Sequence, residues 1–207
     1  MLAIFDMDGT LTDSSTLLAN AINYVRGKLN LEPLPKDIII EQINNPECDL
    51  AKFFYNVDRF EPIYEEWFKE YYSRYHDLEL ELYDGVEEML KTLKSKGVKL
   101  AIATNAYRDS TMEALRHLGI LELFDDIVCF DDVKEGKPSP LMLFKLLDNF
   151  KLTNKDAIFV GDSQRDELAA KAANIEFIKV AFGSNIEGLV NRPSEVVRKI
   201  EEYFCII

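Results

Sequence analysis

Positive charge is scarce in this sequence. Its 24 lysines and arginines stand against 37 aspartates and glutamates, which gives a formal net charge of −13. A protein that binds nucleic acid non-specifically needs a basic face, and an anionic membrane attracts basic segments. We therefore expect neither nucleic acid nor a membrane surface among its partners. A phosphate group can still be bound where positive charge is concentrated locally.

Cysteines and long apolar runs are also rare. The three cysteines, Cys48, Cys129 and Cys205, lie far apart and form no C-x-x-C pair, so we expect free thiols in a reducing compartment. No stretch approaches the 18 apolar residues of a membrane span. The apolar run at 2–5 follows no basic segment of the kind that begins a signal peptide. These absences predict a cytoplasmic protein.

Five short apolar runs recur along the chain, at 2–5, 98–103, 127–130, 157–160 and 177–180. Most are continuous rather than alternating, which is typical of parallel strands covered on both faces. Helical patterns lie between them, at 86–96, 110–118, 141–150, 166–173 and 194–204. The alternation of strand and helix predicts an α/β fold with a doubly wound parallel sheet.

Residues 14–80 interrupt this alternation. Apolar stripes predict helices at 16–29, 36–43, 49–55 and 63–75, and no strand pattern of comparable strength occurs among them. The last of these helices is rich in aromatic residues, which we expect to form the core of this segment. The sequence therefore predicts a helical insertion after the first strand of the sheet.

Polar side chains gather where the predicted strands end. In an open α/β sheet, ligands bind beyond the carboxyl ends of the strands. The residues at those ends, with the segment between the third and fourth strands, include Asp6, Asp8, Thr10, Thr104, Asn105, Lys137, Asp162, Ser163 and Asp166. Clustered carboxylates repel one another unless a cation is bound, and an all-oxygen set suits Mg²⁺. We predict a Mg²⁺ site that forms, with Lys137, a cationic pocket for phosphate.

Such a pocket can transfer a phosphoryl group. One carboxylate can attack phosphorus, and a second can give a proton to the leaving oxygen and later take one from water. Asp6 and Asp8 are two residues apart, which suits this division of labour. Thr104 and Asn105 can donate hydrogen bonds to phosphate oxygens.

Four stretches resemble the motifs of the haloacid dehalogenase-like superfamily of phosphohydrolases. Residues 6–11 (DMDGTL) resemble the first motif, 104–105 (TN) the second, 137–140 (KPSP) the third and 161–166 (GDSQRD) the fourth, in the family's order. The resemblance implies a Rossmann-like core, with the first strand between the second and the fourth. It also implies that the insertion is an α-helical cap, as in the phosphoglycolate phosphatase and β-phosphoglucomutase subfamily. The expected domains are a catalytic core of residues 1–13 and 81–207 and a cap of residues 14–80.

The resemblance implies roles for the matched carboxylates. Asp6 would be the nucleophile and a Mg²⁺ ligand, and Asp8 the acid/base, which binds the metal through its backbone carbonyl. Asp162 would bind the metal directly. Asp166 would complete the metal site, either as a ligand or through a bound water.

The remaining expected site residues bind substrate. The resemblance implies that Thr104 and Lys137 take part in catalysis by holding the transferring phosphoryl group, with Asn105 assisting. Arg108 begins a helix near these residues and is a further candidate for contact with the substrate.

These features predict a Mg²⁺-dependent phosphatase that hydrolyses a small phosphorylated metabolite, phosphoglycolate or a sugar phosphate, through an aspartyl-phosphate. One alternative is a phosphosugar mutase of the β-phosphoglucomutase type, but residues 14–18 contain no histidine of the kind such mutases carry. Another is a non-catalytic phosphate-binding protein on the same fold. Residues 43–50 lack the glycine and arginine that relatives often carry in the substrate-specificity loop, so the substrate stays open. A monomer and a homodimer are both compatible with the sequence.

Overall fold

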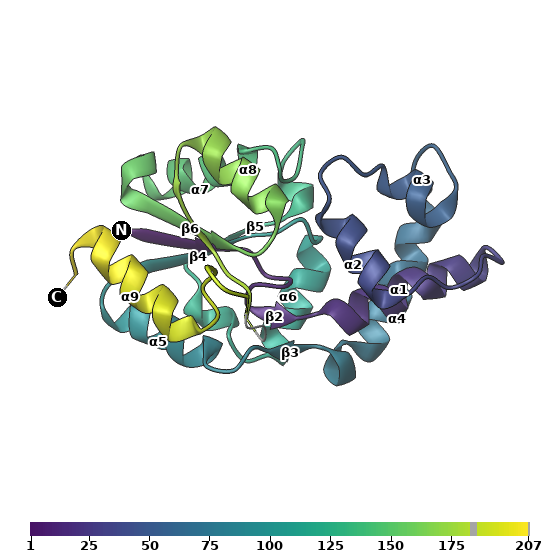
Figure 1. The fold of residues 1–207 in the computed structure, drawn as a ribbon, viewed down its shortest axis with the longest axis horizontal. Helices are drawn as coiled ribbons and strands as arrows, with labels where there is room; N and C mark the ends of the chain where they lie inside the picture. The colour runs from purple at the N-terminus through teal and green to yellow at the C-terminus, as the bar shows by residue number, and fades with distance from the viewer. Residues whose placement is uncertain (183–185, 207) are drawn as a thin grey trace. The chain divides into compact units, whose positions relative to one another are not determined.

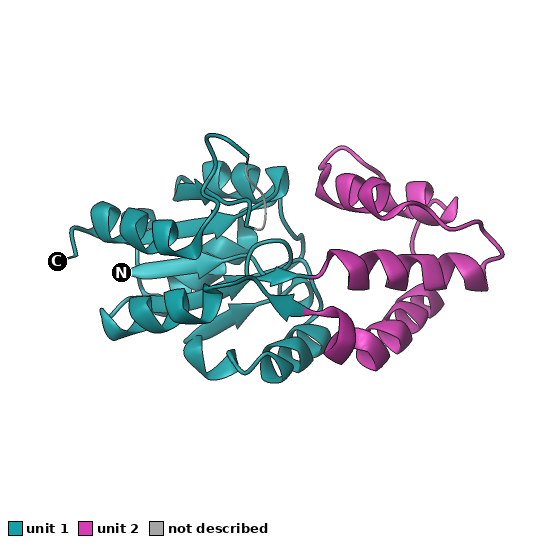
Figure 2. Cartoon of the chain, turned by 60° about the horizontal axis from the view of Figure 1, so that its bottom comes forward, with its two compact units in different colours: residues 1–13, 81–207 teal, residues 14–80 magenta. Residues whose placement is uncertain are grey.

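The computed structural model describes residues 1–182 and 186–206. The chain forms two compact units, one of residues 1–13 and 81–207 and one of residues 14–80 (Figure 2). Each unit has its own set of packed elements.

The larger unit is built on a five-stranded parallel sheet. Its strands, in spatial order, are Asp126–Val128 (β5), Lys99–Ala103 (β4), Leu2–Phe5 (β1), Ala157–Gly161 (β6) and Glu176–Lys179 (β7). The first strand lies between the second and fourth of the predicted strands, so the predicted order is confirmed. In the register of the sheet, Phe5 lies opposite both Ile102 and Val160. The residues that follow β1, β4 and β6 therefore emerge at one edge.

The third predicted strand ends earlier than expected. The apolar run at 127–130 predicts a strand through Phe130, whereas β5 stops at Val128 and Phe130–Asp132 (η2) forms a 3₁₀ turn. The Asp132 carboxylate accepts a hydrogen bond of 2.8 Å from the Cys129 amide. The Phe130 amide donates to the Ala106 carbonyl at 3.0 Å. These bonds take the backbone out of the sheet.

Helices cover both faces of the sheet (Figure 1). On one face, Leu141–Phe150 (α7) and Gln164–Ala173 (α8) pack apolar side chains into a buried cluster with those of β1, β4 and β6. On the other face, Val86–Ser95 (α5) packs against Pro193–Phe204 (α9) and β4. The remaining helical elements of this unit are Arg108–His117 (α6), Leu121–Leu123 (η1) and Asn154–Asp156 (η3).

Two short strands pair antiparallel where the chain leaves the larger unit and where it returns to it. They are Thr12–Asp13 (β2) and Glu81–Leu82 (β3). Thr12 pairs with Leu82, and Asp13 pairs with Glu81. The sequence did not predict this pair, because strands of two residues are too short to show a hydrophobic period.

The smaller unit consists of the helices Ser15–Lys28 (α1), Lys36–Asn44 (α2), Leu50–Tyr55 (α3) and Pro62–Glu79 (α4). Its core contains Ile22, Val25, Ile39 and Phe54, with Tyr64, Trp67 and Phe68 of α4 packed against them. The expectation that the aromatic helix supplies the core of this segment is thus confirmed for those three rings. The helix runs four residues beyond its predicted end at 75, since no glycine or proline interrupts residues 76–79.

A buried guanidinium joins two elements of this core. Arg26 of α1 donates to the Glu32 carbonyl at 2.8 Å through Nε and to the Phe54 carbonyl through Nη1. Burial lowers the pKa of Arg26. Within residues 1–182 and 186–206, no helix has both the length and the apolar character to cross a membrane.

Candidate active site

The first carboxylate of the site is Asp6, directly after β1. The four residues of β1 are completely buried, so the strand fixes the position at which Asp6 leaves the sheet. The Asp6 amide continues the parallel ladder by donating to the Val160 carbonyl at 2.9 Å. Asp6 is 6% exposed, and its side chain forms an ion pair with Lys137.

Lys137 lies between two carboxylates. Its Nζ pairs with Asp6 on one side and lies 2.7 Å from Asp166 Oδ1 on the other. Lys137 is 5% exposed and Asp166 is 0% exposed. Burial by itself lowers the pKa of Lys137, but attraction to Asp166 and Asp6 outweighs it, and the net pKa is raised. Lys137 is therefore a fixed buried ammonium at the edge of the sheet.

The loop after β1 also positions Asp162, which follows β6. Thr10 Oγ1 donates a hydrogen bond of 3.2 Å to Asp162 Oδ1. Gly9 has φ +82°, and a Cβ at this position would lie 2.5 Å from Asp162 Oδ2. Gly9 and Thr10 thus hold one carboxylate against the loop that carries two others, a function that the sequence analysis did not assign. The glycine directly after Asp8 was the available signal.

Asp166 is held by the first turn of α8. Its Oδ2 accepts from the Ser163 amide at 3.1 Å and from the Ser163 hydroxyl at 2.5 Å, and the Asp166 amide donates back to Ser163 Oγ at 3.2 Å. This reciprocal capping box locks the helix start. Since Oδ1 pairs with Lys137, both oxygens of Asp166 already have protein partners. The S-x-x-D spacing at 163–166 was visible in the sequence, although only Asp166 was assigned a role.

The carboxylates form a strongly anionic cluster. Oxygens of Asp6, Asp162 and Asp166 lie within 4.8 Å of one another. Burial raises the pKa of Asp6 well above its usual range, and repulsion from Asp166 and Asp162 adds to this effect while Lys137 opposes it. Burial and repulsion from Asp166 raise the pKa of Asp162 to about 6. The cluster carries more negative charge than its lysine neutralises, so a divalent cation with oxygen ligands fits it.

Asp8 lies in the tight turn that follows Asp6. The amides of Leu11 and Thr12 both donate to the Met7 carbonyl, at 2.8 Å and 3.0 Å, and the Gly9 amide donates to the Thr12 carbonyl at 2.8 Å. These bonds fix the backbone on both sides of Asp8. The turn brings Asp8 to the same strand end as Asp6.

Thr104 and Asn105 follow β4, the strand beside β1. The Thr104 amide donates to the Val128 carbonyl at 3.1 Å, and its hydroxyl accepts from the Ala106 amide at 3.1 Å. This leaves the Thr104 hydroxyl proton to be donated. The Asn105 side chain binds the backbone of Lys137 at both of its polar ends, with 2.9 Å from Nδ2 to the Lys137 carbonyl and 2.8 Å from the Lys137 amide to Oδ1.

Arg108 is engaged elsewhere on the sheet edge. Its Nη2 donates to the Ile127 carbonyl at 2.8 Å, and its guanidinium pairs with Asp132. These contacts hold the side chain beside β5. A substrate contact by Arg108 stays a prediction, and it would have to be made in addition to the Asp132 pair or in exchange for it.

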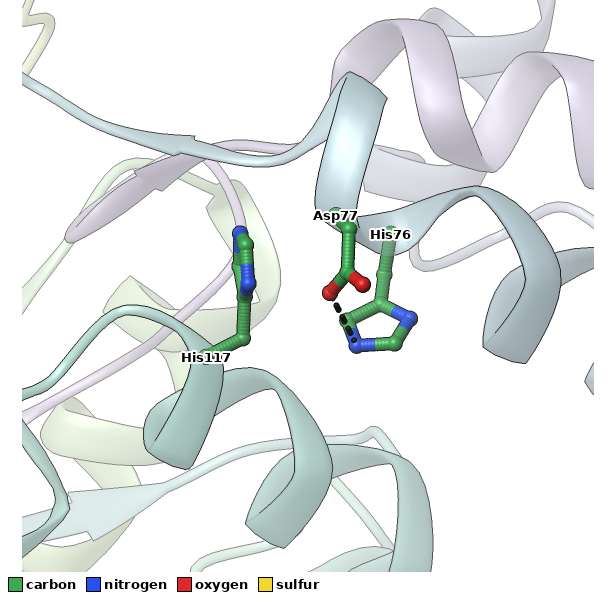
Figure 3. Close-up of side chains that lie close together, drawn as sticks. All are labelled: His76, Asp77 and His117. Carbon is green, nitrogen blue, oxygen red and sulfur yellow. Dashed lines mark ion pairs between the residues drawn. The ribbon is translucent and has the colours of Figure 1, made fainter.

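The two histidines belong to different units and are not members of this carboxylate cluster. Figure 3 shows both imidazoles together with Asp77. In α4, His76 Nε2 lies 2.9 Å from Asp77 Oδ1, and His76 Nδ1 lies 3.2 Å from the Ser73 carbonyl. The imidazole also stacks on Tyr72 of the same helix. Tyr72, Ser73 and Asp77 belong to the same helix as His76. His117 is the last residue of α6.

A parallel α/β core with carboxylates, a lysine and a threonine at one edge defines a class of hydrolases, and comparison with known proteins gives the family. Residues 3–180 match the family model described as haloacid dehalogenase-like hydrolase, and the chain belongs to this family. The resemblance seen in the four motifs is thereby confirmed.

Several relatives are similar over nearly the whole chain. The pyrophosphatase PpaX of Halalkalibacterium halodurans is 33% identical over 99% of this chain and 95% of its own length. The phosphoglycolate phosphatase of Colwellia psychrerythraea is 31% identical over 91% of this chain and 88% of its own. A solved structure from Haemophilus somnus, described as a predicted phosphoglycolate phosphatase, is 28% identical with a TM-score of 0.82 and covers 96% of this chain and 97% of that one. The chain is thus an enzyme of the phosphatase type.

Proposed function

We propose that this enzyme hydrolyses a small phosphomonoester in a Mg²⁺-dependent reaction that passes through an aspartyl-phosphate on Asp6. The observation that supports this proposal most strongly is the buried Lys137 ammonium, which pairs with Asp6 and lies 2.7 Å from Asp166. This arrangement concentrates positive charge beside a carboxylate that stands at a strand end. Both features suit in-line attack on a phosphate dianion.

In the first step, a carboxylate oxygen of Asp6 attacks phosphorus and the bond from phosphorus to the ester oxygen breaks. Asp8 gives its proton to the leaving oxygen. In the second step, Asp8 takes a proton from water, the water oxygen attacks phosphorus and the bond to Asp6 breaks. The products are the alcohol and inorganic phosphate, and both carboxylates return to their starting states. Thr104 and Lys137 hold the phosphoryl oxygens throughout.

We propose that Asp6, Asp162 and the backbone carbonyl of Asp8 hold the Mg²⁺. When bound, the ion supplies positive charge that offsets the carboxylate cluster and the substrate phosphate. Asp166 was predicted to complete the metal site. Its oxygens lie within 4.8 Å of those of Asp6 and Asp162, so we propose that it completes the metal site through a bound water while it also holds Lys137 and the start of α8. Asp6 and Asp162 each engage only one oxygen in the contacts described above.

Phosphoglycolate is the first candidate substrate, followed by sugar phosphates. The names of the relatives support a small phosphorylated compound, and they add pyrophosphate to the candidates. We propose that the four helices of residues 14–80 form a cap domain and determine which of these compounds is accepted. The acidic composition argues against nucleic acid and an anionic membrane as partners. We further propose a cytoplasmic location and either a monomer or a homodimer.

The test is phosphate release from phosphoglycolate, several sugar phosphates and pyrophosphate, with Mg²⁺ and with a chelator. Asp6→Asn is the matched control because it keeps the shape of the side chain and removes the nucleophilic charge. We expect release that needs Mg²⁺ and is lost in the variant. Full activity of Asp6→Asn would refute the nucleophile. Phosphate that moves between positions of a sugar, without release, would indicate a mutase.

A further inference from the structure

We propose that Asn105 is a positioning residue that acts through Lys137, and that it does not bind substrate itself. The inference rests on the proposed function, because it concerns the lysine that holds the phosphoryl group. The Asn105 amide group forms two hydrogen bonds with one residue, accepting from the Lys137 amide at 2.8 Å and donating to the Lys137 carbonyl at 2.9 Å. Bonds of this length at both polar ends fix the backbone of Lys137 relative to Asn105.

The two residues stand on different kinds of structure. Asn105 comes directly after Thr104, whose amide extends the pairing of β4 with β5 by bonding the Val128 carbonyl at 3.1 Å. Lys137 lies in the irregular segment between η2 and α7. The backbone of a loop is more mobile than that of a strand. The two hydrogen bonds from Asn105 therefore hold the Lys137 backbone in a fixed position relative to the sheet.

The segment before Lys137 is pressed against the same side chain. A Cβ on Gly136 would lie 2.5 Å from Asn105 Oδ1 and 2.8 Å from a ring carbon of Phe130. No side chain fits at residue 136 without displacing Asn105. The glycine of the G-K-P sequence therefore permits the double hydrogen bond.

The consequence for catalysis follows from the position of Nζ. Lys137 is 5% exposed, and its ammonium bonds Asp6 and Asp166 at once, so a shift of its backbone would move the charge away from one of them. A displacement of roughly 1 Å in a positioned group can cost about 100-fold in rate. Asn105→Ala removes both bonds, and we expect it to lower kcat/KM by about that factor.

A double-mutant cycle separates this role from direct contact with substrate. If Asn105 acts only through Lys137, then Asn105→Ala lowers kcat/KM strongly in the wild type but by less than about 3-fold in the Lys137→Met background. A direct contact between Asn105 and substrate would cost the same factor in both backgrounds, and that result would overturn the proposal. Asn149→Ala is the matched control, because the Asn149 amide donates to a surface carboxylate, that of Asp126 at 2.7 Å.

A second measurement does not depend on activity. We expect the backbone amide of Lys137 to exchange its hydrogen at least about 10-fold faster in Asn105→Ala than in the wild type, as followed by NMR, and to be unchanged in Asn149→Ala. Gly136→Ala should produce the same faster exchange. An unchanged exchange rate in Asn105→Ala would overturn the proposal. If the wild type released no phosphate from any ester, the proposed function would fail while this measurement would still decide the role of Asn105.

Discussion

Lys137 and Asp166 form an ion pair of 2.7 Å in which both side chains are almost completely excluded from solvent. The second partner of the lysine is Asp6, so one ammonium links the end of β1 to the first turn of α8. An unpaired charge at this depth would be very unfavourable, and the three groups therefore depend on one another. The stability of the core and the arrangement of its site rest on the same contacts.

Replacing the lysine should affect both properties. We expect Lys137→Met to lower kcat/KM by about 100- to 1,000-fold, which leaves residual turnover that can be measured. We also expect it to lower the free energy of unfolding by about 3–5 kcal/mol, because Asp6 and Asp166 would remain buried without a positive partner. Urea unfolding monitored by circular dichroism measures the second effect. The control is Lys145→Met. In the wild type, Lys145 donates a partly exposed hydrogen bond of 2.9 Å to the Asp132 carbonyl, and its loss should cost about 1 kcal/mol. A similar cost for the two variants would contradict the assigned pairing.

Gly9→Ala should disturb Asp162 specifically. A Cβ at residue 9 would lie 2.5 Å from Asp162 Oδ2, and the φ of +82° is unfavourable for alanine by about 1–2 kcal/mol. Gly97→Ala is a close control, because Gly97 has φ +78° but no atom within 4 Å of the new Cβ. We expect the positive φ to destabilise both variants by this amount, so both should unfold at a lower temperature than the wild type. Only Gly9→Ala should also weaken Mg²⁺ binding in calorimetry, and equal Mg²⁺ affinities would show that the contact with Asp162 is unimportant.

Stability should fall with rising pH in the metal-free protein. The pKa of Asp162 is about 6 in the folded state against an ordinary value of 3.8, and the pKa of Asp6 is also raised. Between about pH 4 and about pH 6 the folded state binds more protons than the unfolded state. The stability that the protonated Asp162 contributes is therefore fully present below about pH 4 and is lost as pH rises through about 6. Urea unfolding across this range measures the slope. Asp162→Asn should flatten it, and an unchanged slope in this variant would contradict the assignment.

The smaller unit has its own sensitive contact in Arg26. Arg26→Met leaves the buried Phe54 carbonyl and the Glu32 carbonyl without their guanidinium donors, so we expect it to destabilise this unit by about 1–3 kcal/mol. The control is Arg59→Met, because Arg59 is 86% exposed and lies 3.7 Å from Glu61. Its loss should cost less than about 1 kcal/mol. Differential scanning calorimetry compares the two, and equal transition temperatures would count against a structural role for Arg26.

The sequence predicted the framework of the fold because its signals are local. Continuous apolar runs located β1, β4 and β6, and the residues that follow these strands are the ones that the sheet brings to one edge. The predicted end of β5 was wrong. The strand ends at Val128 because the next two amides donate to the Asp132 carboxylate and the Ala106 carbonyl. Such contacts are made by the folded chain and leave no hydrophobic pattern.

The same limit applies to the site. Asp6, Lys137, Asp162 and Asp166 lie together where the motifs predicted them. The partner of each one was not readable, since it depends on side chains brought together from distant parts of the chain. The Asn105 amide, expected at the phosphate, lies on the Lys137 backbone, and the Arg108 guanidinium lies on Asp132.

The measurement that tests the central claim most directly is the mass of the peptide that contains Asp6, isolated after rapid acid quenching of the enzyme during turnover of its best substrate with Mg²⁺. The account predicts a gain of one phosphoryl group, located on Asp6 by fragmentation and absent from Asp6→Asn. A phosphoryl group on another residue, or turnover by Asp6→Asn, would contradict it.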